Sequence, residues 1–208
     1  MTMIQRILAQ AIAFTMGIAM LFQAGCAGRS ETASFYVLSP VAERELAMKN
    51  ISGDSTISIG ISPVSLPKYL KKSQIVTRTG SNELHLAEFN RWAGKIEEDI
   101  GRVIAENLTN LLATDRVFAY PLMEAIDLNY TIKIDFSRFD GALGGAVELI
   151  ARWAIFDRQG NIVHGVKATH LIEPVKGPGY ADMVAAQSQV LASFSRQLAE
   201  EIIELSGS

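Results

Sequence analysis

The chain of 208 residues has a single cysteine, Cys26, which excludes an intramolecular disulfide, a cysteine-rich zinc site and a redox pair. It also lacks an excess of one charge. The formal net charge of −3 at pH 7 gives no basic field to draw the chain onto nucleic acid. With 6 prolines and 16 glycines, collagen-like and linker-dominated architectures are excluded. The 49% of hydrophobic residues excludes an intrinsically disordered chain, and the length allows one domain or two small ones.

Motifs typical of enzymes are missing as well. His85, His164 and His170 form no HExxH arrangement, and the last two would lie about 20 Å apart on one predicted strand, too far to share a metal. The chain has no GxSxG elbow, and its glycine-rich stretch 141–145 lacks the P-loop lysine. The acidic cluster 97–99 fits the first turn of a helix, where carboxylates favour the helix dipole. The sequence therefore predicts a non-enzymatic protein without metal or cofactor.

The N-terminus carries the features of an export signal. Arg6 is the only charge before Cys26, and the mostly apolar stretch 7–22 is shorter than the roughly 20 residues that a membrane-spanning helix needs. A positive start, a short apolar stretch and small residues are the layout of a secretory signal. The small residues 24–25 run directly into Cys26, which looks like a bacterial lipoprotein processing site, with Gln23 where that class usually has an aliphatic residue.

The resemblance to lipoproteins implies that residues 1–25 are removed and that Cys26 is the lipid-attachment site, carrying a diacylglyceryl group and palmitate-type acylation. Each buried CH₂ contributes about 0.8 kcal/mol, so a triacylated N-terminus is held firmly on a bilayer. Ala27 follows the cysteine where an aspartate commonly retains lipoproteins at the inner membrane, which favours the outer membrane. An ordinary secretory signal with an incidental cysteine is the alternative. Residues 26–33 are then a lipidated tether, and 34–208 form one domain.

The mature chain predicts a mixture of strands and helices. Period-two patterns and β-branched or aromatic residues predict strands at 34–38, 56–64, 75–79, 83–86, 117–120, 130–136, 146–156 and 162–173. Apolar residues spaced by threes and fours predict helices at 95–113 and 180–205. The stretch 89–93 is expected to lead into the first helix, and 140–145 to connect two strands of an antiparallel meander. This order predicts a single-domain α+β fold, in which two main helices pack on one face of a largely antiparallel sheet.

Five segments carry a resemblance to a known family: FYVL at 35–38, IGISPVSLPKYL at 59–70, HLAEFNRWA at 85–93, IDFSRFDG at 134–141 and GYADMV at 179–184. In this order, and spread evenly over the mature chain, they resemble the PqiC/YmbA family of ABC-type transport auxiliary lipoproteins, which are membrane integrity-associated transporter subunits. The resemblance implies an outer-membrane lipoprotein that forms a homo-oligomeric ring and receives the far end of a periplasm-spanning MCE-domain protein, itself anchored in the inner membrane with its partner there.

Such a protein acts as a non-enzymatic adaptor that aids phospholipid movement between membranes and supports envelope integrity. The alternative is a tethered periplasmic lipid-binding module that carries its ligand in its own cavity, and phospholipid bound to the purified monomer would favour it. The exposed candidates for contact are the stretch 89–93 and the loop 67–72, although core packing is at least as well supported for Trp92. The cluster of Lys68, Lys71 and Lys72 is expected to face solvent rather than anionic lipid.

Overall fold

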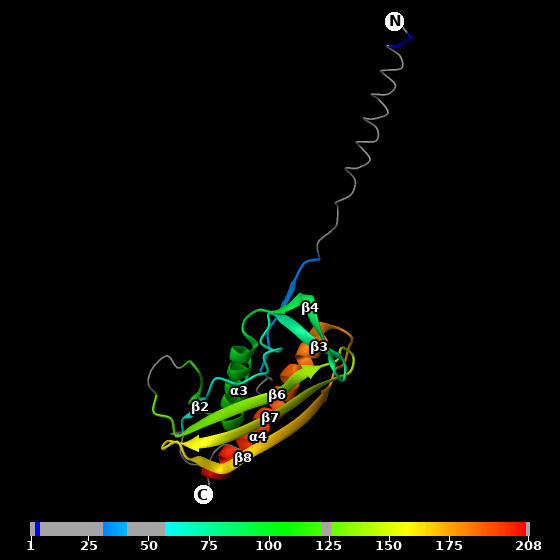
Figure 1. Cartoon of the computed structure of the whole chain (residues 1–208). Coiled ribbons are helices and arrows are strands. Elements are labelled where there is room, and N and C mark those ends of the chain that lie inside the picture. The colour runs from blue at the N-terminus through cyan, green and yellow to red at the C-terminus, as the bar shows by residue number, and fades with distance from the viewer. Residues whose placement is uncertain (1–2, 5–30, 41–56, 122–125, 207–208) are drawn as a thin grey trace. The chain divides into compact units, whose positions relative to one another are not determined.

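Figure 1 shows a computed structural model of the chain, which describes residues 3–4, 31–40, 57–121 and 126–206. Cys26 and nearly all of the predicted signal lie outside the described residues. A compact unit spans Ala33–Ser208. Within the described part of the chain, no helix combines the length and the apolar character needed to cross a bilayer.

The described elements follow in the order β1 (Ser34–Tyr36), β2 (Ile59–Ile61), β3 (Gln74–Gly80), β4 (Glu83–Trp92), α3 (Ile96–Leu112), β5 (Val117–Ala119), β6 (Tyr130–Gly141), β7 (Ala146–Asp157), β8 (Ile162–Pro174) and α4 (Tyr180–Ser206). Every predicted strand and both predicted helices are present, and the α+β class is confirmed. Two boundaries differ from the prediction. β4 extends as far as Trp92, so the stretch 89–93 that leads into α3 is mostly strand, and the first two residues of the connection 140–145 belong to β6.

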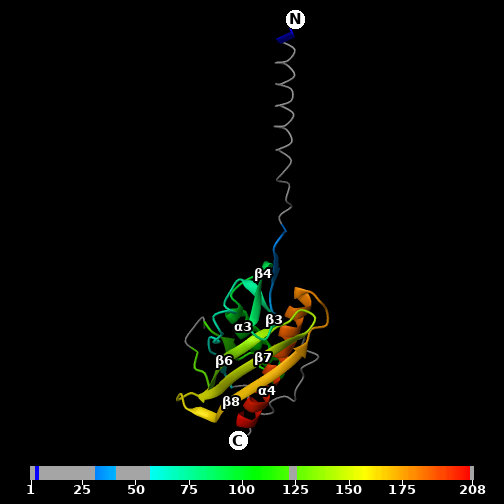
Figure 2. The same cartoon turned by 45° about the vertical axis from the view of Figure 1, so that its right-hand side comes forward.

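The strands form one mixed, curled sheet with β6 at its centre (Figure 2). β6 pairs antiparallel with β7 over its whole length, and parallel with β2 and with one residue of β3. β7 pairs with β8, which completes the predicted antiparallel meander. β3 and β4 form a hairpin, and the short β1 pairs parallel with β4. Among the described strands β1, β5 and β8 are therefore the edges of the sheet, and β8 is the longest of the three.

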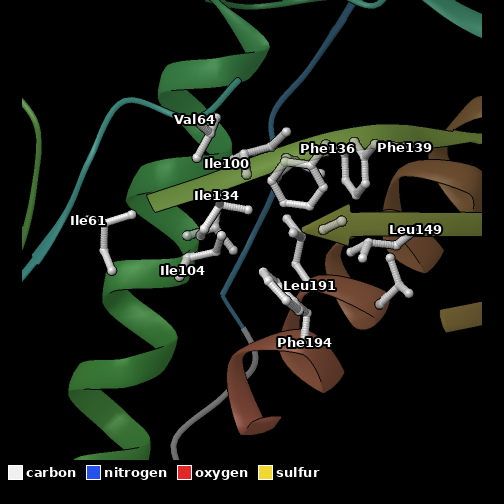
Figure 3. Packing of buried hydrophobic residues seen from close by; sticks show 14 of the residues in the cluster. Ile61, Val64, Ile100, Ile104, Ile134, Phe136, Phe139, Leu149, Leu191 and Phe194 are labelled. Atoms are coloured by element: carbon white, nitrogen blue, oxygen red, sulfur yellow. The ribbon is translucent and has the colours of Figure 1, made fainter. Parts of the chain in front are cut away.

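Both helices cover the same face of the sheet, and their apolar stripes are confirmed (Figures 1 and 2). The buried residues of α3 include Ile96, Ile100, Val103, Ile104, Leu108, Leu111 and Leu112. Figure 3 shows how the two helices and β6 enclose the core. The ring of Phe136 lies with its centroid 5.9 Å from that of Phe139 and 5.8 Å from that of Phe194. Each such buried side chain contributes about 1.5–3 kcal/mol, and together they fill the space between the sheet and α4.

A bulge in β6 places two phenylalanines only three residues apart on the same face. The register with β7 shifts between Phe136 and Arg138, so that Ser137 is the extra residue. Because strand side chains alternate between faces, the insertion turns Phe139 into the core and sends Arg138 and Asp140 to the opposite side. We refer to this side of β6–β8, opposite the helices, as the outer face.

Candidate functional site

Asp140, near the end of β6, is a buried carboxylate on the outer face. Arg78 of β3 donates from Nε to Oδ1 at 2.9 Å and from Nη2 to Oδ2 at 3.0 Å. The hydroxyl of Tyr69 donates to Oδ2 at 2.7 Å, and Nε of Arg138 donates to Oδ1 at 3.2 Å. Both oxygens thus accept two hydrogen bonds, which is the condition for keeping a charge out of water at tolerable cost.

The same contacts continue across the sheet. Arg138 also forms an ion pair with Glu148 of β7, and Nε2 of His170 on β8 lies 2.7 Å from Oε1 of Glu148. We refer to the linked side chains Tyr69, Arg78, Arg138, Asp140, Glu148 and His170 as the Asp140 network. It joins β3, β6, β7 and β8, and its members bind one another. The geometry of the Asp140 network therefore indicates a structural role, in which it links these strands to one another.

The electrostatics of the Asp140 network agree with a structural role. Burial by itself raises the pKa of Asp140, but hydrogen bonds from Arg78, Tyr69 and Arg138 outweigh burial and hold the pKa below its ordinary value. Burial, and then the hydrogen bond to Asp140, raises the pKa of Tyr69 from 10.0 to about 12. At neutral pH the two groups are a fixed carboxylate and a fixed phenol. Neither has the pKa near 7 that suits general acid–base catalysis.

Farther along the outer face lies an open apolar groove of about 500 Å³. Phe156 of β7, Ile162 and Val166 of β8, and Pro63 line it, and we refer to it as the outer groove. Nζ of Lys133 lies 4.2 Å from the centroid of the Phe156 ring, a cation–π contact at the wall. Ile162 and Val166 are exposed on a strand that has only β7 as its partner in the described sheet. Exposed apolar side chains beside an unpaired strand are typical of a surface that contacts protein.

A bulge at Gly165 interrupts β8 beside the groove. Trp153 of β7 faces Lys167, but Ile155 already faces Val163, so three residues of β8 lie opposite one residue of β7. The φ of Gly165 is 77°, a left-handed conformation that glycine adopts without a steric penalty. Bulges of this kind limit indiscriminate pairing along an edge strand.

The structure places the predicted contact residues in different environments. Trp92 is only 7% exposed and packs in the core, which confirms the packing alternative, whereas Phe89 remains 37% exposed on β4. Lys68, Lys71 and Lys72 are exposed, a position that suits contact with solvent and contact with an anionic lipid surface equally.

Sequence reasoning missed the Asp140 network. Tyr69 and Arg78 lie 71 and 62 residues before Asp140, and the three residues form no local motif. The only available signal was the pair of opposite charges, Arg138 and Asp140, directly after a strongly alternating strand.

Residues 36–199 match the sequence profile of a protein family described as the ABC-type transport auxiliary lipoprotein component. The chain belongs to this family. The resemblance carried by the five sequence segments is thereby confirmed, and both the Asp140 network and the outer groove lie inside the matched range of this auxiliary lipoprotein family.

Two kinds of relatives accompany the family match. The intermembrane transport lipoprotein PqiC of Escherichia coli (strain K12) is 25% identical over 189 residues, which cover 90% of this chain and 96% of PqiC, and PqiC of Shigella flexneri gives the same values. The crystal structure of an uncharacterized protein has a TM-score of 0.66 and 24% identity, covering 83% of this chain and 99% of that one. Protein XCC0632 from Xanthomonas campestris has a TM-score of 0.66 and 15% identity, covering 84% and 97%. These two structures share the fold.

Proposed function

We propose that this chain is a lipoprotein of the outer membrane, attached at the periplasmic face through acylated Cys26. In this proposal it is a non-enzymatic adaptor of a Pqi-like intermembrane phospholipid transport system, where it docks an MCE-domain protein that spans the periplasm. The observation that carries the proposal is the match to the intermembrane transport lipoprotein PqiC over 90% of this chain and 96% of PqiC. A match over nearly the whole of both chains favours a shared role more strongly than a match over one part would.

The packing of the chain favours an adaptor over a lipid carrier. A carrier needs an inward apolar cavity for acyl chains. Here the space between α4 and the sheet is occupied by buried side chains, among them Phe136, Phe139 and Phe194. The outer groove, an apolar surface that is open to a ligand, lies on the opposite face of the sheet.

We further propose that copies of the chain associate through β8 and the outer groove. β8 has 13 residues and is the longest edge of the described sheet, and it carries the exposed apolar side chains Ile162 and Val166, which a partner can cover. A second copy is a suitable partner, because proteins tethered to the same membrane have a high local concentration of their own copies. A contact between two different surfaces of identical copies closes into a ring when the rotation between them allows.

The decisive experiment is a mild-detergent pull-down of the tagged full-length protein from envelopes, with Cys26→Ala in parallel. We expect an MCE-domain protein and its inner-membrane partner to come down with the wild type. Palmitate labelling of the same samples should mark the wild type and not Cys26→Ala. The variant then tells whether the acyl anchor is needed for the protein contact.

Two outcomes contradict the proposal in different ways. A protein that comes down alone, as a monomer carrying phospholipid, replaces the adaptor by the lipid carrier. If the wild type takes up no palmitate, the N-terminus is an ordinary secretory signal with an incidental cysteine. An adaptor role then depends on protein contacts alone.

A further inference from the structure

A second group of exposed apolar side chains lies on the first strand of the fold and its neighbour. Phe35 is 65% exposed, Val37 55% and Phe89 37%. Phe35 is in register with Arg91, two residues after Phe89, so Phe35 and Phe89 lie on neighbouring, paired strands. Val37 follows Phe35 by two residues and continues the row. We refer to Phe35, Val37 and Phe89 as the β1–β4 patch.

The strand that carries this patch is held firmly against the fold. The hydroxyl of Tyr36 donates to Oδ1 of Asn90 at 2.9 Å. One residue past Val37, the N–H of Leu38 donates to Oδ2 of Asp99 at 2.6 Å, and Nη2 of Arg102 donates to the carbonyl oxygen of Leu38 at 2.8 Å. Contacts on both sides of Val37 therefore keep the exposed row in one orientation.

Basic side chains border the β1–β4 patch. Arg91 lies in register with Phe35, and the N–H of Trp92 donates to the carbonyl oxygen of Ser73 at 2.7 Å, which brings the exposed Lys71 and Lys72 to the end of β4. Glu88 is the acidic neighbour of Phe89, and it too is exposed. Aromatic and aliphatic side chains flanked by lysine and arginine are the composition that binds the interface of an anionic bilayer.

The patch also lies at a defined end of the folded unit. β1 and β4 are at the end opposite the C-terminus of α4 (Figures 1 and 2). Ser34 follows Cys26 by eight residues, a length that reaches at most about 28 Å when fully extended. An acyl anchor on Cys26 therefore keeps the first strand within that distance of the lipid surface and gives it a high effective concentration there.

We infer that the β1–β4 patch inserts into the headgroup region of the bilayer that holds the anchor, with the lipid surface as its occupant. This inference rests on the proposed acylation of Cys26 for its location, but the patch itself binds lipid without the acyl group. Anchor and patch together fix the orientation of the domain, because two points of attachment prevent it from swinging on its tether. The end that carries the C-terminus then points away from the membrane.

The test uses the chain from residue 26 with Cys26→Ser, which contains all of the compact unit and no cysteine. Val37→Cys in this background carries an environment-sensitive NBD label, and Val166→Cys carries the same label in the outer groove as the matched control. We expect vesicles of phosphatidylethanolamine and phosphatidylglycerol to shift the emission of the label at position 37 to the blue and to leave the label at 166 unchanged. Vesicles of phosphatidylcholine alone should give a smaller shift.

A second pair of variants measures the contribution of the two aromatic rings. Phe35→Ser with Phe89→Ser should lower vesicle partitioning at least about tenfold, whereas Ile162→Ser with Val166→Ser, which act only through the association of copies, should lower it less. The inference is overturned if the label at 37 does not respond, if both labels respond alike, or if both pairs lose binding equally. Circular dichroism checks that each variant is folded. The chain used in this test carries no acyl group. A failure of the membrane inference is therefore distinguishable from a failure of the adaptor proposal, which depends on palmitate labelling and the pull-down.

Discussion

Asp140 is the residue whose replacement should reveal most directly what the polar network does. Asp140→Asn leaves Arg78 and Arg138 without the carboxylate between them, and losing one partner of a buried pair costs about 3 kcal/mol, the low end of the usual range because both arginines reach solvent. Urea unfolding measures this loss. Asp135→Asn changes an exposed carboxylate on the same strand and should alter the free energy of unfolding by less than about 0.5 kcal/mol. Equal losses in the two variants would contradict a structural role for the Asp140 network.

The same carboxylate makes stability depend on pH in the acid range. Its pKa in the folded chain is below the ordinary value of 3.8, so the folded state holds the charged form more strongly than the unfolded state does. This contribution is fully present above the unfolded pKa and is lost as the pH falls through the folded pKa. The difference in unfolding free energy between wild type and Asp140→Asn should therefore shrink on acidification below about pH 4. A difference that stays constant to lower pH would show that the charge is not responsible.

Tyr69 gives the corresponding prediction at alkaline pH. Burial and the hydrogen bond to Asp140 raise its pKa from 10.0 to about 12, so the folded state retains the phenol proton. The stabilisation is fully present below pH 10 and is lost as the pH rises toward 12. In an absorbance titration of the 5 tyrosines, the latest phase should disappear in Tyr69→Phe. Tyr120→Phe removes an exposed phenol and should leave that phase in place.

At the scale of elements, periodicity in the sequence predicted the features that depend on residues within one segment. It missed the features that depend on contacts between segments far apart in the chain. The stripes of α3 and α4 and the meander β6–β8 follow from patterns within each segment. The extension of β4 to Trp92 does not, because the mixed stretch 89–93 is a strand only through its pairing with β1 and β3. The site follows the same rule. The bulge at Ser137 decides that Asp140 faces Arg78 and Tyr69, and neither residue is near it in the chain.

The end of α3 offers a test of backbone conformation alone. Ala113 has φ 48° and ψ 43°, and its N–H donates to the carbonyl oxygen of Thr109, which is a left-handed helix cap. Glycine takes this conformation without the penalty that a Cβ imposes, so Ala113→Gly should raise the free energy of unfolding by about 0.5–1 kcal/mol. Ala105→Gly, inside the same helix, should lower it by about 1 kcal/mol or more. Thermal or urea unfolding of the pair decides the sign, and a destabilised Ala113→Gly would contradict the left-handed cap.

At the scale of the whole molecule, the exposed apolar groups separate into two main surfaces. The β1–β4 patch lies at the end of the compact unit opposite the C-terminus of α4 (Figure 1). The outer groove lies on the face of the sheet away from the helices, and the β7–β8 hairpin that bounds it is at the same end as the C-terminus (Figures 1 and 2). A protein that contacts a membrane at one end and protein at the other requires this separation, because one surface cannot serve both contacts at once.

Because the two surfaces are separate, we expect that different substitutions can remove self-association and membrane binding. Ile162→Ser with Val166→Ser takes two exposed apolar side chains from the β8 edge, each worth about 1 kcal/mol when covered by another copy. We expect sedimentation velocity of the chain from residue 26 with Cys26→Ser to give a discrete oligomer, and this variant pair to shift it toward the monomer. Phe35→Ser with Phe89→Ser removes a similar apolar area and should leave the oligomer intact.

The two variant pairs thus form a reciprocal experiment, in which each is the control for the other. A wild type that sediments as a monomer, or an oligomer that survives Ile162→Ser with Val166→Ser, contradicts association through β8 while leaving the membrane inference untouched. If both pairs of substitutions dissociate the oligomer, the β1–β4 patch contacts a neighbouring copy. That outcome contradicts the inference that lipid covers the patch. Only loss of the oligomer in one pair and of vesicle binding in the other supports a domain held by lipid at one end and by its own copies along β8.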